Sequence, residues 1–244
     1  MITKADIKLI VSLQLKKQRQ KYGQFVVEGE KSIAELLTSP FNIDTLYGTS
    51  AWLNATKLNL KHIACVEITE KELQQLSVHQ TPQGALAVVN IPKWELSAAD
   101  FQNDFAIALD DLQDPGNLGT IIRIADWYGI KTIVCSKTCT DVFNPKCINS
   151  TMGSFTRVKV VYEDILEVSQ KFNQPIIAAT LNGDNIHQLK TQPKGLILIG
   201  NEGHGIGDEL LSAAKYQITI PRIGQAESLN AAVSAAIIID NLIR

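Results

Sequence analysis

Three segments in the second half of the chain place chemically capable side chains next to turns. The first holds Asn117 and Arg123 and follows an apolar run and a Pro-Gly turn. The second holds Glu202 in a glycine-rich loop, and the third holds Ser228 and Asn230 before an alanine-rich stretch. Amide, hydroxyl, carboxylate and guanidinium groups orient polar ligands by hydrogen bonds and bind anions, but some of these residue types also cap helices.

Local structure explains some of these residues without a ligand. Asn117 and Ser228 stand where helix N-caps are expected, and Arg123 is spaced to pair with an acidic residue three positions later. Local structure explains Asn230 less well, because asparagine is a poor helix former unless its amide has a partner. Glu202 has no evident structural purpose beside exposed backbone amides. Spacing alone therefore favours a functional role at Glu202 and local structural roles at Asn117 and Arg123.

Four glycines within residues 200–207 let the backbone turn sharply and approach a ligand closely. Their spacing matches neither the phosphate-binding P-loop nor the dinucleotide-binding G-x-G-x-x-G pattern. The loop therefore gives no support to a nucleotide site of either kind.

The elements around these segments alternate between apolar strands and helices. Strands rich in Ile, Val and Leu without polar alternation are typical of a parallel sheet covered by helices on both faces. Ligands of such sheets bind where loops leave the carboxyl ends of the strands, and all three segments follow predicted strands. We expect strands over 105–109, 132–136, 158–161, 175–180, 195–200 and 217–221 and helices over 118–128, 145–152, 164–172 and 228–242.

The first part of the chain predicts a smaller α/β domain. Residues 1–92 alternate between short helices and strands, and the stretch 91–104 contains a proline and polar residues without a clear period. We therefore expect a domain over 1–92, a linker over 93–104 and a second α/β domain over 105–244. In the first domain we expect helices over 6–20, 29–37 and 70–76, a short apolar run over 24–28, and strands over 43–47, 63–68 and 85–90.

Charge is distributed unevenly along the chain. The net charge of the 244 residues is −2, but residues 1–31 carry seven basic against three acidic side chains, which leaves the remainder at −6. Lys16, Lys17 and Arg19 make this segment a candidate RNA-binding face, because phosphate contacts need only a local positive patch. The same lysines equally fit the solvated face of an ordinary amphipathic helix.

The remaining composition indicates a reduced cytoplasmic protein. No run approaches the roughly 18 apolar residues of a membrane span, and the start lacks the basic-then-apolar pattern of a signal peptide. Cys65, Cys135, Cys139 and Cys147 form no C-x-x-C pair, so we expect free thiols and no metal site. A metal site of Cys135, Cys139 and a distant histidine would match no common ligand spacing.

The order and wording of the three segments resemble motifs 1 to 3 of the SpoU (TrmH-type) RNA 2′-O-methyltransferases of the SPOUT superfamily. The matching stretches are Asn117-Leu-Gly-Thr-Ile-Ile-Arg123, Gly200-Asn-Glu-Gly203 and Ile220-Pro with Ser228-Leu-Asn230. The stretch Asn144-Pro-Lys to Met152-Gly-Ser154 is similar to the family's segment between motifs 1 and 2. Residues 16–30 more loosely resemble the substrate-binding, ribosomal-protein-like domain that is often fused to this family.

The resemblance implies the fold, the cofactor and the assembly. It implies a deep trefoil knot in the second domain, a bent S-adenosyl-L-methionine held at Gly200, Ile220 and Leu229, with Thr180 lining its pocket, and a homodimer with the site near the subunit interface. The alanine-rich helix suits close packing there. The implied substrate is structured RNA, with ribosomal RNA favoured over transfer RNA because of the first domain. No metal is required.

The resemblance also implies a catalytic set. The arginine matching Arg123 lies beside the ribose 2′-hydroxyl in the family and is often called the base. A guanidinium with a pKa above about 12 is a poor proton acceptor, so we expect Arg123 to stay charged, stabilise the developing alkoxide and hold the adjacent phosphate. Phosphate or water would take the proton. Asn117, Glu202, Ser228 and Asn230 would orient Arg123 and the ribose.

The sequence departs from the family's pattern at one position, and two alternative functions are considered. Many relatives carry an arginine about where Asn149 stands, which bears on RNA grip or substrate choice. A non-catalytic RNA-binding or ribosome assembly protein of the same fold is the main alternative function, although the intact motif residues argue against it. An NAD-dependent oxidoreductase rests only on the α/β pattern and one glycine-rich loop.

Overall fold

The computed structural model describes residues 2–102, 105–189 and 194–243, and these fall into two compact units. Unit 1 combines the chain up to Lys93 with Asp141–Thr156, and unit 2 combines Trp94–Thr140 with the chain from Arg157 onward. No helix among the described residues is long and apolar enough to cross a membrane.

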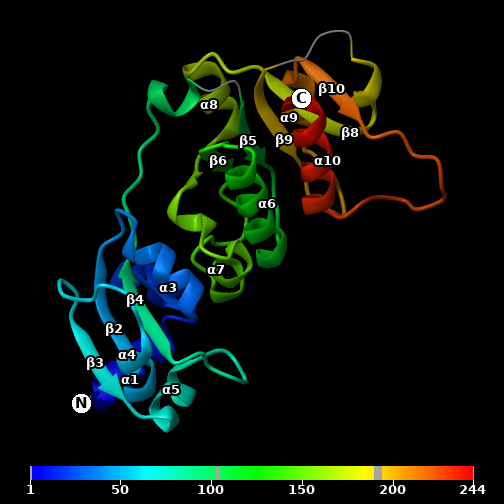
Figure 1. Ribbon diagram of the computed structural model, residues 1–244. Coiled ribbons are helices and arrows are strands. Elements are labelled where there is room, and N and C mark those ends of the chain that lie inside the picture. Colours follow the sequence, from blue (N-terminus) through cyan, green and yellow to red (C-terminus); the bar gives the residue numbers. More distant parts are fainter. Residues whose placement is uncertain (1, 103–104, 190–193, 244) are drawn as a thin grey trace. The chain divides into compact units, whose positions relative to one another are not determined.

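Unit 1 is built on a mixed sheet with the strand order β1-β4-β2-β3. The β1/β4 and β2/β4 pairs are antiparallel and β2/β3 is parallel. Its core includes Leu13, Leu86 and Leu73, all of them almost fully buried. The strands are β1 (Gln24–Glu28), β2 (Ile43–Thr49), β3 (Cys65–Ile68) and β4 (Ala85–Asn90), and the helices are α1 (Lys4–Ser12), α2 (Lys16–Tyr22), α3 (Glu30–Leu37), α4 (Ser50–Ala55), α5 (Glu70–Leu76) and α7 (Pro145–Thr151) (Figure 1).

The segment 141–156 packs with unit 1, whereas we expected it within the second domain. Aromatic packing is the reason. The ring of Phe143 lies 4.5 Å from that of Phe25 on β1, and Phe155 contacts Phe25 and Phe41 at 6.1 and 5.5 Å. These rings join a segment that is distant in sequence to the core of the first unit.

The expected single helix over 6–20 is wrong, because α1 and α2 are separate. The guanidinium of Arg19 donates hydrogen bonds to the carbonyl oxygens of Leu13 and Gln14 at 2.9 and 2.8 Å. In a continuous helix these two carbonyls would accept from amides four residues later. A side chain therefore replaces the helical partners and holds the break. Helix α4 was also missed by the sequence analysis.

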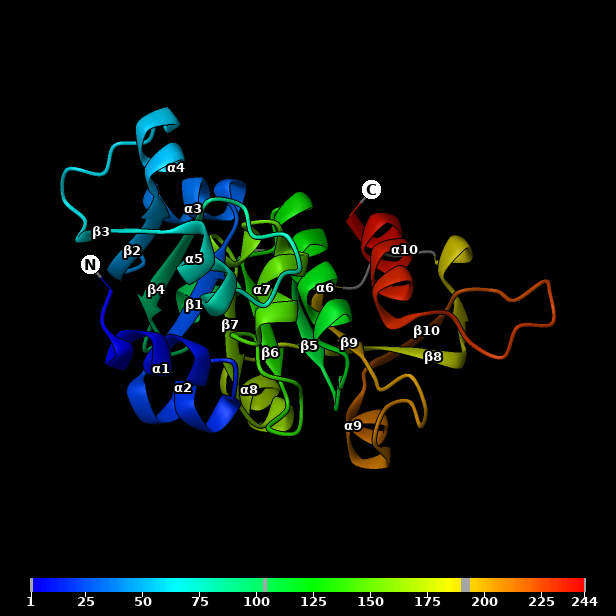
Figure 2. The ribbon, with the colours of Figure 1, turned by 90° about the horizontal axis from the view of Figure 1, so that it is seen from below.

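Unit 2 is built on a sheet with the strand order β10-β8-β9-β5-β6-β7, in which every pair is parallel, as expected. Helices α6 and α10 lie on one face of this sheet and α8 and α9 on the other (Figure 2). The strands are β5 (Phe105–Leu109), β6 (Thr132–Cys135), β7 (Lys159–Tyr162), β8 (Ile176–Asn185), β9 (Gly195–Ile199) and β10 (Tyr216–Thr219), and the helices are α6 (Pro115–Trp127), α8 (Ile165–Lys171), α9 (Asp208–Ala213) and α10 (Ala231–Ile243).

Several element boundaries in unit 2 differ from the expected ones. Helix α6 begins at Pro115 and α10 only at Ala231, and α9 was not expected. Strand β8 continues past Thr180, where we expected it to end. Its pairing with β10 shifts between Gln217 and Ile218, so residues 179–183 bulge out of the ladder. Such a bulge leaves no clear signal in the sequence.

Candidate functional site

The three loops singled out in the sequence leave the same edge of the unit 2 sheet. Strands β5, β9 and β10 are parallel and end at Leu109, Ile199 and Thr219, so the loops 110–114, 200–207 and 220–230 all start from their carboxyl ends. This edge is where parallel α/β sheets bind ligands. The topology thus brings together side chains that lie 85 and 113 residues apart in sequence.

One hydrogen-bonded chain of side chains joins the three loops. The amide nitrogen of Asn230 donates to the carbonyl oxygen of Asn117 at 3.0 Å. The amide nitrogen of Asn117 in turn donates to a carboxylate oxygen of Glu202. Asn117 is half-buried, and the other two side chains are exposed. The cluster therefore has a polar surface that faces away from the core and can receive a polar ligand.

The starts of two helices position the two asparagines. The N-cap of α6 is Asp114, whose carboxylate accepts from the backbone N–H of Asn117 at 2.9 Å. Asn230 caps α10, because its side-chain oxygen accepts from the N–H groups of Ala232 and Val233 at 3.0 and 3.3 Å. The expected N-cap roles of Asn117 and Ser228 are therefore wrong. Capping by Asn230 leaves its amide nitrogen to reach Asn117.

The glycine-rich loop is anchored to the residues that follow β5. The Asn201 amide donates to the backbone oxygen of Asp111 at 2.8 Å, and the N–H of Gly207 donates to the Asp110 carboxylate at 3.0 Å. A Cβ at Gly200 would lie 2.5 Å from the backbone of Gly205, so the folded-back loop requires glycine there. Sequence reasoning missed both aspartates. Their signal was a pair of acidic residues directly after an apolar strand.

Arg123 does not join the Asn117 cluster within the chain. It lies six residues further along α6, about 9 Å along the helix axis and about 120° away around it. Its side chain is exposed, and among the described residues it makes no hydrogen bond or ion pair. Asp126, the acidic residue three positions after Arg123, instead forms an ion pair with Arg157, with 2.9 Å between a guanidinium nitrogen and a carboxylate oxygen. Ser228 lies exposed in the loop that precedes α10.

The residues expected to hold a cofactor lie around the same edge. Thr180 lies in the bulge of β8, and its hydroxyl oxygen is buried without a hydrogen-bond partner among the described residues. Ile220 follows β10 and is half-buried, and the side chain of Leu229 is 47% exposed. Leu181, next to Thr180, is 73% exposed, and its backbone oxygen accepts from the Thr219 hydroxyl at 3.2 Å. These neighbours combine an unsatisfied hydroxyl with exposed apolar side chains.

The basic face of unit 1 is smaller than expected. Lys16 and Lys17 are exposed on α2, but Arg19 is only 2% exposed. Its guanidinium donates to the Asp141 carboxylate at 2.6 and 2.9 Å. Arg19 is thus committed to an internal ion pair and is not placed to contact a phosphate at the surface.

The cysteines of the described chain are free thiols, and Cys139 supports the loop after β5. Its sulfur accepts from the N–H of Leu112 and donates to the oxygen of Leu109, both at 3.2 Å. A hydrogen bond from Cys135 lowers the pKa of the Cys139 thiol to about 7, against the opposing effect of burial. In the described ranges, no group of three His, Cys, Asp or Glu side chains is arranged to hold a metal ion.

Comparisons with known proteins cover both units. Residues 104–240 match the model of the SpoU rRNA Methylase family, and residues 4–87 match that of the MRM3-like substrate binding domain. The 23S rRNA (guanosine(2553)-2′-O)-methyltransferase RlmP of Bacillus subtilis is 31% identical over 94% of this chain and 92% of its own length.

Two further relatives match along nearly the whole chain. The 23S rRNA (uridine(2479)-2′-O)-methyltransferase of Streptomyces viridochromogenes is 26% identical over 93% of this chain and 85% of its own. The structure of an AdoMet-bound rRNA methyltransferase from Sinorhizobium meliloti aligns with a TM-score of 0.86 and 28% identity, covering 99% of this chain and 95% of that one.

Proposed function

The chain belongs to the SpoU rRNA methylase family, and on this premise we propose that it methylates a ribose 2′-hydroxyl of ribosomal RNA with S-adenosyl-L-methionine. The names of the relatives from Bacillus subtilis and Streptomyces viridochromogenes support ribosomal over transfer RNA. Within the chain, the observation that carries the proposal is the convergence of Asn117, Glu202 and Asn230 from three separate loops. An enzyme with this substrate would work in the cytoplasm.

The residues around β8 and β10 fit the cofactor. A buried hydroxyl without a partner costs about 1–3 kcal/mol, and a ligand bound beside Thr180 would supply its missing hydrogen bond. Backbone groups at Gly200, Ile220 and Leu229 would hold the cofactor, and the exposed Leu181 offers apolar surface to its adenine. When bound, S-adenosylmethionine supplies a methyl group on a positively charged sulfur. The knot expected from the resemblance stays a prediction.

The reaction needs a site that lowers the cost of ionising the ribose hydroxyl. Alkoxide and sulfonium charges cancel as the new C–O bond forms, so a dry site that brings them together favours the transition state. Arg123, which remains protonated at neutral pH, stabilises the alkoxide and grips the neighbouring phosphate through its paired N–H groups. Water or that phosphate takes the proton. Asn117, Glu202, Ser228 and Asn230 orient the ribose through hydrogen bonds.

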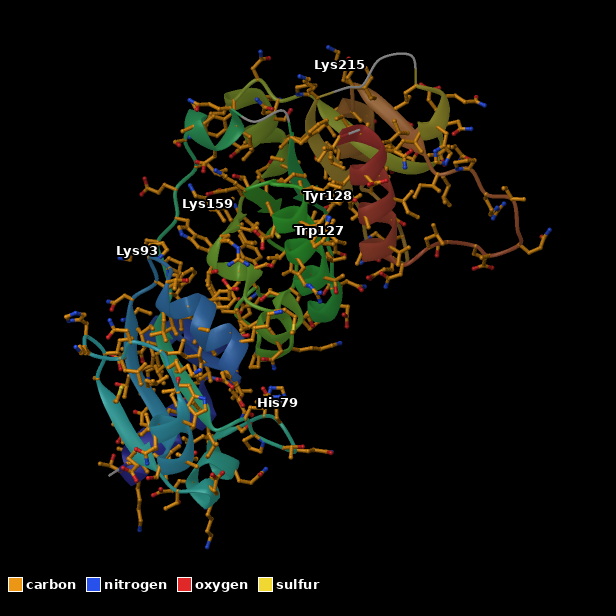
Figure 3. The ribbon with its side chains drawn as sticks, in the orientation of Figure 1. His79, Lys93, Trp127, Tyr128, Lys159 and Lys215 are labelled. Carbon is orange, nitrogen blue, oxygen red and sulfur yellow. The ribbon has the colours of Figure 1, made fainter. Side chains whose placement is uncertain are left out.

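A homodimer would complete this site. Arg123 lies about a third of a turn away from Asn117 around α6, so a second subunit is a simple source for the arginine. The surface of unit 2 also carries exposed apolar side chains. Trp127, at the end of α6, is 85% exposed (Figure 3), and Val233, on α10, is 49% exposed. Large exposed apolar side chains are typical of protein interfaces.

Subunit mixing tests where the arginine comes from. We expect the Arg123→Ala chain to be inactive alone and the Asn117→Asp chain to have its kcat at pH 8 lowered about 10- to 150-fold. If the arginine acts across the interface, random mixing of the two variants restores up to about a quarter of wild-type activity, because half of the dimers carry one intact site. If mixing restores nothing, while the mixed dimer is shown to form, Arg123 acts within its own subunit.

Labelled methyl transfer tests the function itself. The protein is incubated with tritiated S-adenosylmethionine and 23S rRNA transcribed without modifications, and methylated riboses are mapped by their resistance to alkaline cleavage. We expect label at a single ribose. A protein that retains the RNA on a filter but leaves it unlabelled would be a binding protein of the same fold, and the proposal would fail.

A further inference from the structure

An open groove of about 640 Å³ lies within unit 1, on the side of the unit formed by α7 and the loop after α5. Its volume falls in the range of roughly 300–1,000 Å³ that is usual for small-molecule sites. The lining is mostly neutral and polar, and it carries one ammonium group. The lining residues are Gln14, Val78, His79, Asn144, Pro145, Lys146, Asn149 and Ser150.

A buried carboxylate fixes the first wall. Glu28, at the end of β1, is only 8% exposed. Its carboxylate accepts hydrogen bonds from the hydroxyl of Ser77 and from the N–H of Val78, the latter at 3.1 Å. The Ser77 oxygen accepts from the N–H of His79 at 2.9 Å. These bonds hold the loop that presents His79, which Figure 3 labels, in one conformation.

A buried guanidinium fixes the opposite wall. Arg19 donates to the backbone oxygen of Gln14 at 2.8 Å and to the carboxylate of Asp141. The other oxygen of Asp141 accepts from the N–H of Phe143 at 3.0 Å, just before Asn144, the N-cap of α7. Burying a charged group carries a large desolvation penalty, which its hydrogen bonds and ion pairs must offset. Here both of them immobilise residues that border the groove.

One hydrogen bond across the groove leaves a matched donor and acceptor. The amide nitrogen of Asn149 lies 3.0 Å from Nε2 of His79 and donates to it, which places the imidazole proton on Nδ1. Among the described residues, neither Nδ1 of His79 nor the side-chain oxygen of Asn149 has a hydrogen-bond partner. His79 can thus donate one hydrogen bond from Nδ1 and Asn149 can accept one at its side-chain oxygen, and an unpaired nucleotide offers polar groups of both kinds.

We propose that this groove recognises one unpaired nucleotide of the RNA substrate, with His79 donating a hydrogen bond to it, Asn149 accepting one from it and Lys146 facing a phosphate. The proposal rests on the function proposed above and adds the residues that select the RNA. RNA suits the lining better than a peptide does. The lining is rich in amide and imidazole groups with a single positive charge, and its apolar members, Val78 and Pro145, are smaller than the aromatic side chains that anchor protein partners.

Kinetics of His79→Ala, Asn149→Ala and the double variant test the proposal, with the unmodified 23S rRNA transcript as the probe. His62→Ala is the matched control, because His62 is an exposed histidine of unit 1 outside the groove. We expect the KM for RNA to rise about 5- to 100-fold in each single variant, with kcat and cofactor affinity unchanged. The KM of the double variant should be only slightly higher than that of the single variant that binds RNA more weakly, because the two residues act as a pair.

The outcomes separate the groove from the catalytic function. If all variants keep the wild-type thermal unfolding temperature and their KM stays within twofold of wild type, the groove does not bind RNA and the proposal is wrong. If the wild-type chain shows no methyl transfer, the proposed function fails. Filter binding of the same transcript without cofactor then still decides whether His79 and Asn149 contribute to RNA affinity.

Discussion

Asn117 is the middle residue of the hydrogen-bonded side chains that join the three loops. Replacing it by Asp keeps the shape of this side chain but changes its hydrogen-bonding groups. The new carboxylate can still accept from Asn230, but it cannot donate to Glu202. A hydrogen bond to a charged group is worth about 1.5–3 kcal/mol. Each 1.36 kcal/mol corresponds to a factor of ten in rate, so we expect kcat at pH 8 to fall about 10- to 150-fold.

The pH dependence of the Asn117→Asp variant gives a second signature. Two adjacent carboxylates repel each other, which raises the pKa of one of them. Below that raised pKa the pair shares a proton, and the missing hydrogen bond can form again. The ratio of variant to wild-type kcat should therefore rise as the pH falls from 8 toward 5.

Methyl transfer to the 23S rRNA transcript, measured from pH 5 to 8, is the assay. Asn173→Asp is the control, because it makes the same charge change in the turn before β8, at the opposite edge of the sheet. Asparagine and aspartate both tolerate the positive φ found there. An Asn117→Asp variant with kcat within twofold of wild type at every pH would show that the observed chain of hydrogen bonds does not support catalysis.

Three further predictions follow from the site and from unit 1. Arg123→Ala should abolish methylation while leaving the calorimetric Kd of S-adenosylmethionine nearly unchanged, and substantial turnover would refute its role. Charge reversal of Lys16 and Lys17 should weaken RNA binding and reduce the dependence of RNA affinity on salt concentration. If filter binding shows the same salt dependence as for the wild type, α2 does not contact RNA and is only a solvent-exposed helix. Arg19→Met should lower the free energy of unfolding by about 3–5 kcal/mol in urea titrations, because Asp141 loses its buried partner. If the Arg19–Asp141 pair behaved like a surface ion pair, the loss would be less than about 1 kcal/mol.

The fold class and the family could be predicted from the amino-acid sequence alone. Apolar strands without alternation indicated a parallel sheet, and the observed sheet is parallel throughout. The ordered motifs around Asn117, Glu202 and Ser228 identified the family, because each motif is local in sequence. Hydrophobic pattern and motif wording are properties of short segments and can therefore be read directly from the chain.

The hydrogen-bond partners and the burial of these residues could not be predicted from the sequence. Capping by Asp114 and Asn230, the burial of Arg19 and the break between α1 and α2 depend on partners far away in sequence or on competing local hydrogen bonds. The joining of residues 141–156 to unit 1, and with it the groove at His79, depends on aromatic contacts across more than a hundred residues. No local pattern encodes such contacts, because their free energy arises when distant segments bury surface together.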